Sequence, residues 1–243
     1  MQIEPLPPPS PSLEREVHRR LRDLIVSGDL VPGALYSMNE LAAQLHVSRT
    51  PVAQAVGRLV DQGMVRVEHR RGLRVLETST HDLAEIYELR LLLEPRATYR
   101  ATGLMRKGDH RRLKEALVAL SGAAAAAGNP REFVRRDSDF HRVIMNASGN
   151  RRLADFVASL RDLQLIRAAS TVNRSRSRTD VVADHQRIYD AIVSGDAVAA
   201  ARQMHQHILT TGELLIRQET GEPAAVLSGP WPASAGTDTS APA

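Results

Sequence analysis

The sequence predicts a mainly α-helical protein in two parts, an N-terminal unit of three helices and a β-hairpin followed by an all-α antiparallel helical bundle. Three observations predict this class. Aromatic residues make up only 3% of the 243 residues, whereas strands are enriched in aromatic and β-branched side chains. The alternating patterns typical of strands stop at Thr78, and long apolar patterns at helical spacing follow.

The composition excludes several classes of protein. There is no cysteine, so neither disulfides nor thiolate ligands contribute, and any metal must be held by His and carboxylate side chains. No apolar run approaches the roughly 20 residues that span a membrane, and residues 1–12 lack the apolar core of a signal peptide. We therefore expect a cytoplasmic protein without a membrane partner, with a disordered arm at residues 1–12 and a disordered tail at residues 219–243.

The N-terminal unit is expected at residues 13–78. Apolar side chains recur at helical spacing over residues 13–27, which predicts the first helix. Ser37 and Glu40 have the form of a capping box, which predicts the start of the second helix. A short break separates it from a third helix, for which Ser48 is the expected cap.

A β-hairpin completes this unit. Residues 64–68 and 73–76 alternate in the manner of strands around the basic turn HRRG. Three helices and a hairpin make a winged helix-turn-helix by element count. Residues 49–75 carry six Arg against two acidic residues, a balance that suits contact with phosphate.

A winged helix-turn-helix places its second paired helix in the major groove and its wing against the DNA backbone. Arg49 can make a bidentate contact with guanine or phosphate, and Gln54 is a candidate base reader. The residues expected to contact DNA are Ser48, Arg49, Thr50, Gln54 and Arg58 in the helix and Arg70, Arg71 and Gly72 in the wing. The alternative is a small helical domain with solvated arginines, which the joint occurrence of these signals argues against.

Six helices are expected in the second part, residues 79–218, because apolar residues there keep helical spacing. Their expected ranges are 81–104, 108–127, 130–147, 150–171, 177–194 and 196–218.

One carboxylate and three histidines are expected to meet inside this bundle. Asp137 and His141 lie four residues apart and so share one helical face, whereas Asp139 points about 200° away from Asp137. His185 and His207 lie about 15 and 18 Å from the turn that joins the last two helices, so they reach the same level. Such a set suits a divalent metal such as zinc. The alternative is a surface pair with ordinary hydrogen-bonded histidines.

Several segments resemble one known family. Residues 13–76, above all LVPG, LAAQLHVSRTPV, LVDQGMV and RRG, resemble the DNA-binding domain of the GntR family of bacterial transcription regulators. The chain departs from that pattern at Ala53-Gln54, where members often have Arg-Glu, and at Asn39, where some have Arg. These departures bear on the operator sequence.

The second part resembles the FCD ligand-binding domain of the FadR subfamily. The matching segments are YELRLLLEP, DSDFHRVIMNASGNRRL and ADHQRIYDAIVSGDAVAAARQMHQHI, and six helices are typical of the shorter VanR-like branch. The resemblance implies that Asp137, His141, His185 and His207 bind a metal, with zinc expected and nickel or manganese able to use the same donors.

The resemblance also implies a homodimeric repressor that binds a palindromic double-stranded operator and responds to a small organic or sugar acid. Arg90 and Arg167 are candidate partners for the acid, because guanidinium offers a bidentate fork. Arg90 could equally pair with Glu94, one helical turn away. A purely structural metal is one alternative. An enzyme is another, which we reject because no second carboxylate lies at a spacing that marks a general base.

Overall fold

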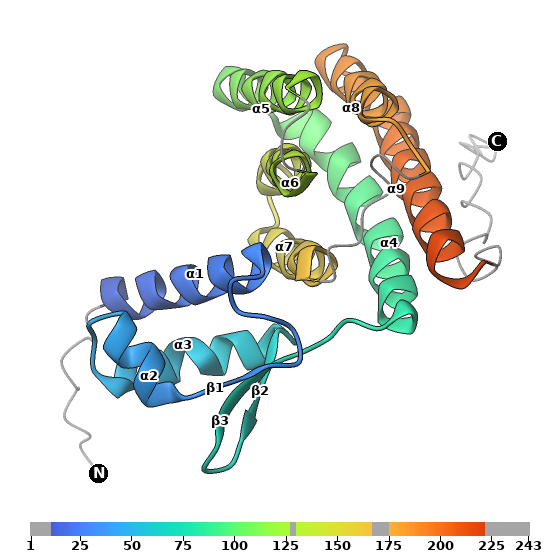
Figure 1. The fold of residues 1–243 in the computed structure, drawn as a ribbon. Coiled ribbons are helices and arrows are strands. Elements are labelled where there is room, and N and C mark those ends of the chain that lie inside the picture. The colour runs from blue at the N-terminus through green and yellow to red at the C-terminus, as the bar shows by residue number, and fades with distance from the viewer. Residues whose placement is uncertain (1–10, 127–129, 167–174, 222–243) are drawn as a thin grey trace, which may run out of the picture.

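The computed structural model describes residues 11–126, 130–166 and 175–221 (Figure 1). The N-terminal part comprises α1 (Pro11–Ser27), β1 (Leu35–Tyr36), α2 (Met38–Gln44), α3 (Arg49–Asp61), β2 (Val65–Glu68) and β3 (Gly72–Val75). The helical part comprises α4 (Thr80–Leu104), α5 (Lys107–Ala125), α6 (Pro130–Ala147), α7 (Arg151–Ile166), α8 (Arg178–Val193) and α9 (Ala197–Thr220). The predicted class, a mainly α protein with a small N-terminal sheet, is confirmed.

The wing sheet has three strands rather than the two expected. β1 pairs antiparallel with β3, and the strand order is β1-β3-β2. The expectation was wrong because two residues are too few to show an alternating pattern. Gly72 permits this pairing, since its φ is 130° and a Cβ there would lie 2.1 Å from the Tyr36 carbonyl oxygen.

One apolar core joins the helices of the N-terminal part to its sheet. Leu21 of α1, Leu59 of α3 and Leu73 of β3 are almost completely buried in it. Ile166, at the end of α7, belongs to the same core. The N-terminal part is therefore packed directly onto the helical part.

The helical part has its own, larger core. α4 lies beside α9, its most extensive neighbour, and α6 and α7 cover another side of α4 (Figure 1). Ser79 caps α4 and Ser177 caps α8, each through a complete capping box. None of the helices in the described residues is long and apolar enough to span a membrane.

The ends of the helices differ slightly from expectation. α1 begins at Pro11 and α9 continues to Thr220, so helix extends past both ends of the expected folded range. α5 ends at Ala125, and α7 is described only as far as Ile166. Residues 1–10 and 222–243, which include most of the arm and tail expected to be disordered, lie outside the described residues.

Candidate functional site

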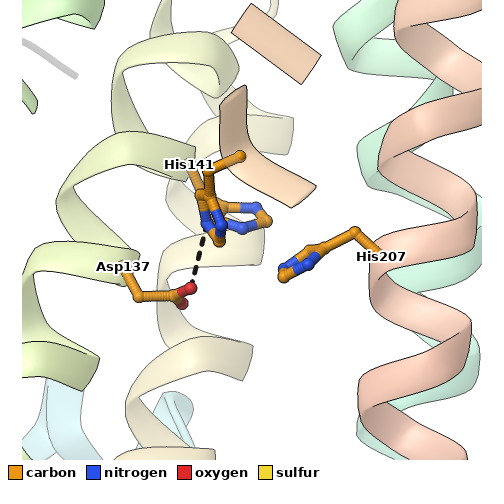
Figure 2. A group of neighbouring side chains, drawn as sticks. Asp137, His141 and His207 are labelled. Atoms are coloured by element: carbon orange, nitrogen blue, oxygen red, sulfur yellow. Dashed lines mark ion pairs between the residues drawn. The ribbon is translucent and has the colours of Figure 1, made fainter. Parts of the chain in front are cut away.

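The four residues expected to bind metal converge inside the bundle. α6 supplies Asp137 and His141, α8 supplies His185 and α9 supplies His207. One ligand atom from each lies within 4.8 Å of those of the other three, and Asp137 and His207 approach from opposite sides in Figure 2. His141 and His185 are completely buried. The helical spacing and the hairpin geometry thus predicted this cluster.

Each of the three imidazoles contacts a protein oxygen through Nδ1, which leaves Nε2 as the possible ligand atom. Nδ1 of His141 lies 2.5 Å from Glu94 Oε2, Nδ1 of His185 lies 2.7 Å from the Val181 carbonyl oxygen, and Nδ1 of His207 lies 3.2 Å from an Asp184 oxygen. These partners fix the orientation of each ring and favour a proton on Nδ1, which leaves the Nε2 lone pair available.

Two of the Nε2 atoms are buried without a hydrogen bond. They belong to His141 and His185, and both are among the few such atoms in the described residues. His185 Nε2 lies 3.0 Å from Asp137 Oδ1, but the contact lacks hydrogen-bond geometry. Buried polar atoms normally have partners, so these lone pairs are available to a group that accepts them, such as a metal ion.

The charge states suit metal ligands. Burial lowers the pKa of His141 to about 3 and that of His207 to about 4, so both rings are neutral near pH 7. Burial alone would raise the pKa of Asp137, but Arg161 and His185 hold it well below its usual value. Neutral imidazoles and an ionised carboxylate are the forms that coordinate metal.

Two charged residues lie at the site that the sequence did not assign to it. Glu94 of α4 is completely buried and accepts a hydrogen bond of 2.6 Å from Arg90 Nε. Arg161 of α7 donates through Nη2 to Asp137, and its Nη1 lies 3.8 Å from Glu94 Oε1. Nε and Nη1 of Arg161 are buried and make no hydrogen bond with any residue that the structure describes. The signal in the sequence was an arginine on the apolar stripe of α7, four residues after Val157.

The residues expected to bind an acid are placed differently. Arg90 is buried, pairs with Glu94 and donates 2.8 Å to Gln164 Oε1, which is the alternative that the sequence left open. Arg167 lies outside the described residues. Asp139, which helical geometry had set aside, pairs with Arg142 away from the cluster.

The expected DNA-contacting residues of α3 lie on its exposed face. Ser48, Arg49, Thr50 and Gln54 are exposed, and Ser48 stands at the N-cap without a side-chain capping bond, so its hydroxyl is accessible. Ser48 therefore occupies the expected N-cap position but does not cap through its side chain. Arg58 is about half exposed and lies 2.8 Å from Glu14 of α1.

The wing presents its basic turn away from the bundle (Figure 1). Arg70 is exposed and has a φ of 59°. Arg71 is exposed and lies 3.1 Å from Glu68, which also accepts from Arg74. Gly72 has a structural role at the β1 crossing, described above, and so fixes where the two arginines lie.

The chain matches known families over most of its length. Residues 13–75 match the family described as bacterial regulatory proteins, gntR family, and residues 85–210 match the FCD domain. A transcriptional regulator of Streptomyces ambofaciens is 30% identical over 80% of this chain and 81% of the relative. The transcriptional repressor GlaR of Escherichia coli is 27% identical over 79% and 91%.

Solved structures of similar fold agree with these matches. McbR/YncC of E. coli superposes with a TM-score of 0.75 over 86% of this chain and 99% of that chain, at 23% identity. A putative GntR regulator of Rhodococcus has a TM-score of 0.67 over 81% and 94%, at 25% identity. The named relatives are transcriptional regulators, and the protein is a regulator rather than an enzyme. It belongs to the GntR family of bacterial transcriptional regulators, in the FadR-like subfamily that carries an FCD domain.

Proposed function

We propose that the protein is a cytoplasmic repressor that binds a palindromic operator as a homodimer, and that a small carboxylate bound beside a divalent metal controls this binding. The exposed start of α3, with Arg49, Thr50 and Gln54, supplies the surface for the major groove. The names of several relatives include repressor, among them GlaR and a probable D-xylose utilization operon repressor. These names support repression as the direction of control.

The observation that carries the metal is the pair of buried Nε2 atoms without hydrogen bonds, on His141 and His185. Together with Asp137 and His207 they offer three nitrogens and one oxygen, a donor set that suits zinc and that nickel or manganese also accept. When bound, the ion would supply a Lewis-acidic centre with coordination positions open to an anionic ligand. The second nitrogens of the rings already have partners, as metal-binding histidines usually do.

The charge balance of the buried site supports an anionic effector. Arg90 and Arg161 are each buried beside a carboxylate, Glu94 and Asp137 respectively. These two cations and two anions cancel before any ion binds. A divalent metal would then add two uncompensated positive charges to a buried site, which is costly unless an anion accompanies it.

Arg161 is the residue that we expect to bind the acid. Its Nε and Nη1 are buried without hydrogen bonds to any described residue, and Nη1 lies 3.8 Å from Glu94 Oε1. The Nε–Nη2 edge of a guanidinium can hold a carboxylate. Arg90 is a weaker choice than the sequence suggested because Glu94 and Gln164 already occupy it. Arg167 stays a prediction.

Elemental analysis and mass spectrometry under native conditions test the metal. The wild type should carry one divalent ion per chain, and His207→Ala should lose it. His205→Ala is the matched control, because this residue lies on α9 but outside the cluster, and it should keep the ion. A wild type that stays metal-free after incubation with Zn²⁺ would contradict the proposal.

Mobility-shift titration on the DNA upstream of the gene tests the regulator. Arg49→Ala should weaken binding, whereas Arg111→Ala, on the exposed surface of α5, should not. A panel of organic and sugar acids should contain at least one that weakens DNA binding only when the metal is present. If metal removal melts the helical part while no acid alters DNA affinity, the metal is purely structural.

A further inference from the structure

Helix α7 connects the candidate metal site with the N-terminal part. It lies between α6 and the helix α1 (Figure 1). Its first half packs Ala154 and Val157 into the core of the helical part. Its last turns pack Leu163 and Ile166 against the core of the N-terminal part. A single helix therefore contributes to both cores.

Two neighbouring residues of α7 make polar contacts in different directions. Arg161 donates to Asp137 in the metal cluster. Asp162 accepts two hydrogen bonds from Arg22 of α1, one of them 2.5 Å from Nε to Oδ2. Successive residues of a helix point about 100° apart, so one turn of α7 can contact the site and the DNA-binding part at once.

The Arg22–Asp162 pair links α7 to α1 through a largely buried contact. The side chain of Asp162 is only 5% exposed and that of Arg22 is 26% exposed. Burial raises the pKa of Asp162, and burial works against the charge of Arg22, whose pKa the contact with Asp162 nevertheless raises. The pair joins α1 to α7 through two hydrogen bonds, so it specifies one relative position of the two helices.

We propose that α7 couples the occupancy of the metal site to the position of the DNA-binding part. Arg161 contacts the site, and the Arg22–Asp162 pair contacts the DNA-binding part. This inference rests on the function proposed above and names its route of regulation. An anion that takes the Nε–Nη2 edge of Arg161 competes with Asp137 for Nη2, and a change in the position of α7 then moves Asp162. Packed helices respond to such changes by small rigid-body shifts.

Distance measurements between spin labels test this route without knowledge of the effector. The chain has no cysteine, so Asp61→Cys on α3 and Lys114→Cys on α5 give two exposed labelling positions. Labelled chains diluted with unlabelled protein report distances within one chain. Metal content and melting temperature are measured on every sample.

The wild type should give one narrow distance distribution. Asp162→Asn and Arg22→Gln should each broaden it, and the double variant should be no broader than either single variant, because both remove the same contact. Asp155→Asn, an exposed position on the same helix, should match the wild type. Neither Arg22 nor Asp162 belongs to the metal cluster, so metal content should not change.

Substitution of Arg161 decides whether the metal site is coupled to the position of the DNA-binding part. Arg161→Gln should shift or broaden the same distribution, whereas Arg161→Lys, which keeps the charge, should stay near the wild type. The proposal is overturned if Arg161→Gln or Asp162→Asn gives the wild-type distribution. A wild type that binds no Zn²⁺ would refute the proposed function instead, while the distances would still decide whether Arg161 and Asp162 set the position of the DNA-binding part.

Discussion

Replacement of Glu94 by glutamine should destabilise the protein and weaken metal binding by separable amounts. One oxygen of Glu94 accepts from Arg90, and the other faces Nδ1 of His141. A glutamine has one oxygen and one NH₂ group, so one of these contacts would place two donors together. The variant would also leave the buried charge of Arg90 without its ion-pair partner.

Loss of one partner from a buried ion pair costs about 3–5 kcal/mol. For a chain of this size, each kcal/mol lowers the melting temperature by roughly 2–4 °C, so a fall of about 6–20 °C is expected. Loss of the carboxylate that orients His141 should lower zinc affinity by about 10–100-fold. The two effects arise from different contacts of the same side chain.

Calorimetry in the presence of a chelator isolates the first effect, and zinc titration of the folded variant isolates the second. Glu115→Gln is the matched control, because Glu115 is 67% exposed and lies 3.9 Å from Arg111, and it should alter neither quantity. The reasoning is refuted if Glu94→Gln melts within 2 °C of the wild type and binds zinc equally well. A lower melting temperature with unchanged zinc affinity would show that Glu94 stabilises the fold but does not orient His141 for metal binding.

Three further predictions follow from the same contacts. Zn²⁺ at 100 times its dissociation constant should stabilise the protein by about 2.7 kcal/mol, measured as a rise in melting temperature that His207→Ala abolishes. Gly72→Ala should lower the free energy of unfolding, measured in urea, by about 1–3 kcal/mol because a Cβ would collide with the Tyr36 carbonyl. Gly57→Ala, where a Cβ would meet nothing within 4 Å, should leave the free energy of unfolding unchanged or raise it. Burial raises the pKa of Tyr87 to about 12, so the unfolded chain loses this proton at a lower pH than the folded chain. The free energy of unfolding should therefore fall by about 1.4 kcal/mol per pH unit between pH 10 and 12. Tyr87→Phe should remove that fall.

The sequence predicted the elements whose signals are local. Capping residues and apolar spacing located the three N-terminal helices and the six helices that follow in the described residues. The grouping of Asp137 with three histidines also followed from local geometry, since helical periodicity and the length of one helical hairpin determine the level of each side chain. β1 was missed because its pairing with β3 depends on contact across the sheet rather than on its own two residues.

The charged residues around the cluster could not be predicted in the same way. Glu94 and Arg161 are 67 positions apart in the sequence, and their burial depends on how α4 and α7 pack onto α6. The same holds for Arg22 and Asp162, which are separated by 140 positions. Charged residues are ordinarily placed on the exposed face when a sequence is read alone. Only the folded chain shows that Glu94, Arg161 and Asp162 are buried and that Arg22 is partly buried.

Four consecutive residues at the end of α7 contact five different residues. Arg161 contacts Asp137, Asp162 holds Arg22, the Leu163 carbonyl accepts from Thr78, and Gln164 bridges Arg90 and Tyr87. A helix held on all sides cannot adjust one of these side chains by shifting its backbone without disturbing the other three. A change at Arg161 must therefore either be absorbed by its own side chain or move the last turn of α7 as a unit, together with the DNA-binding part attached to it.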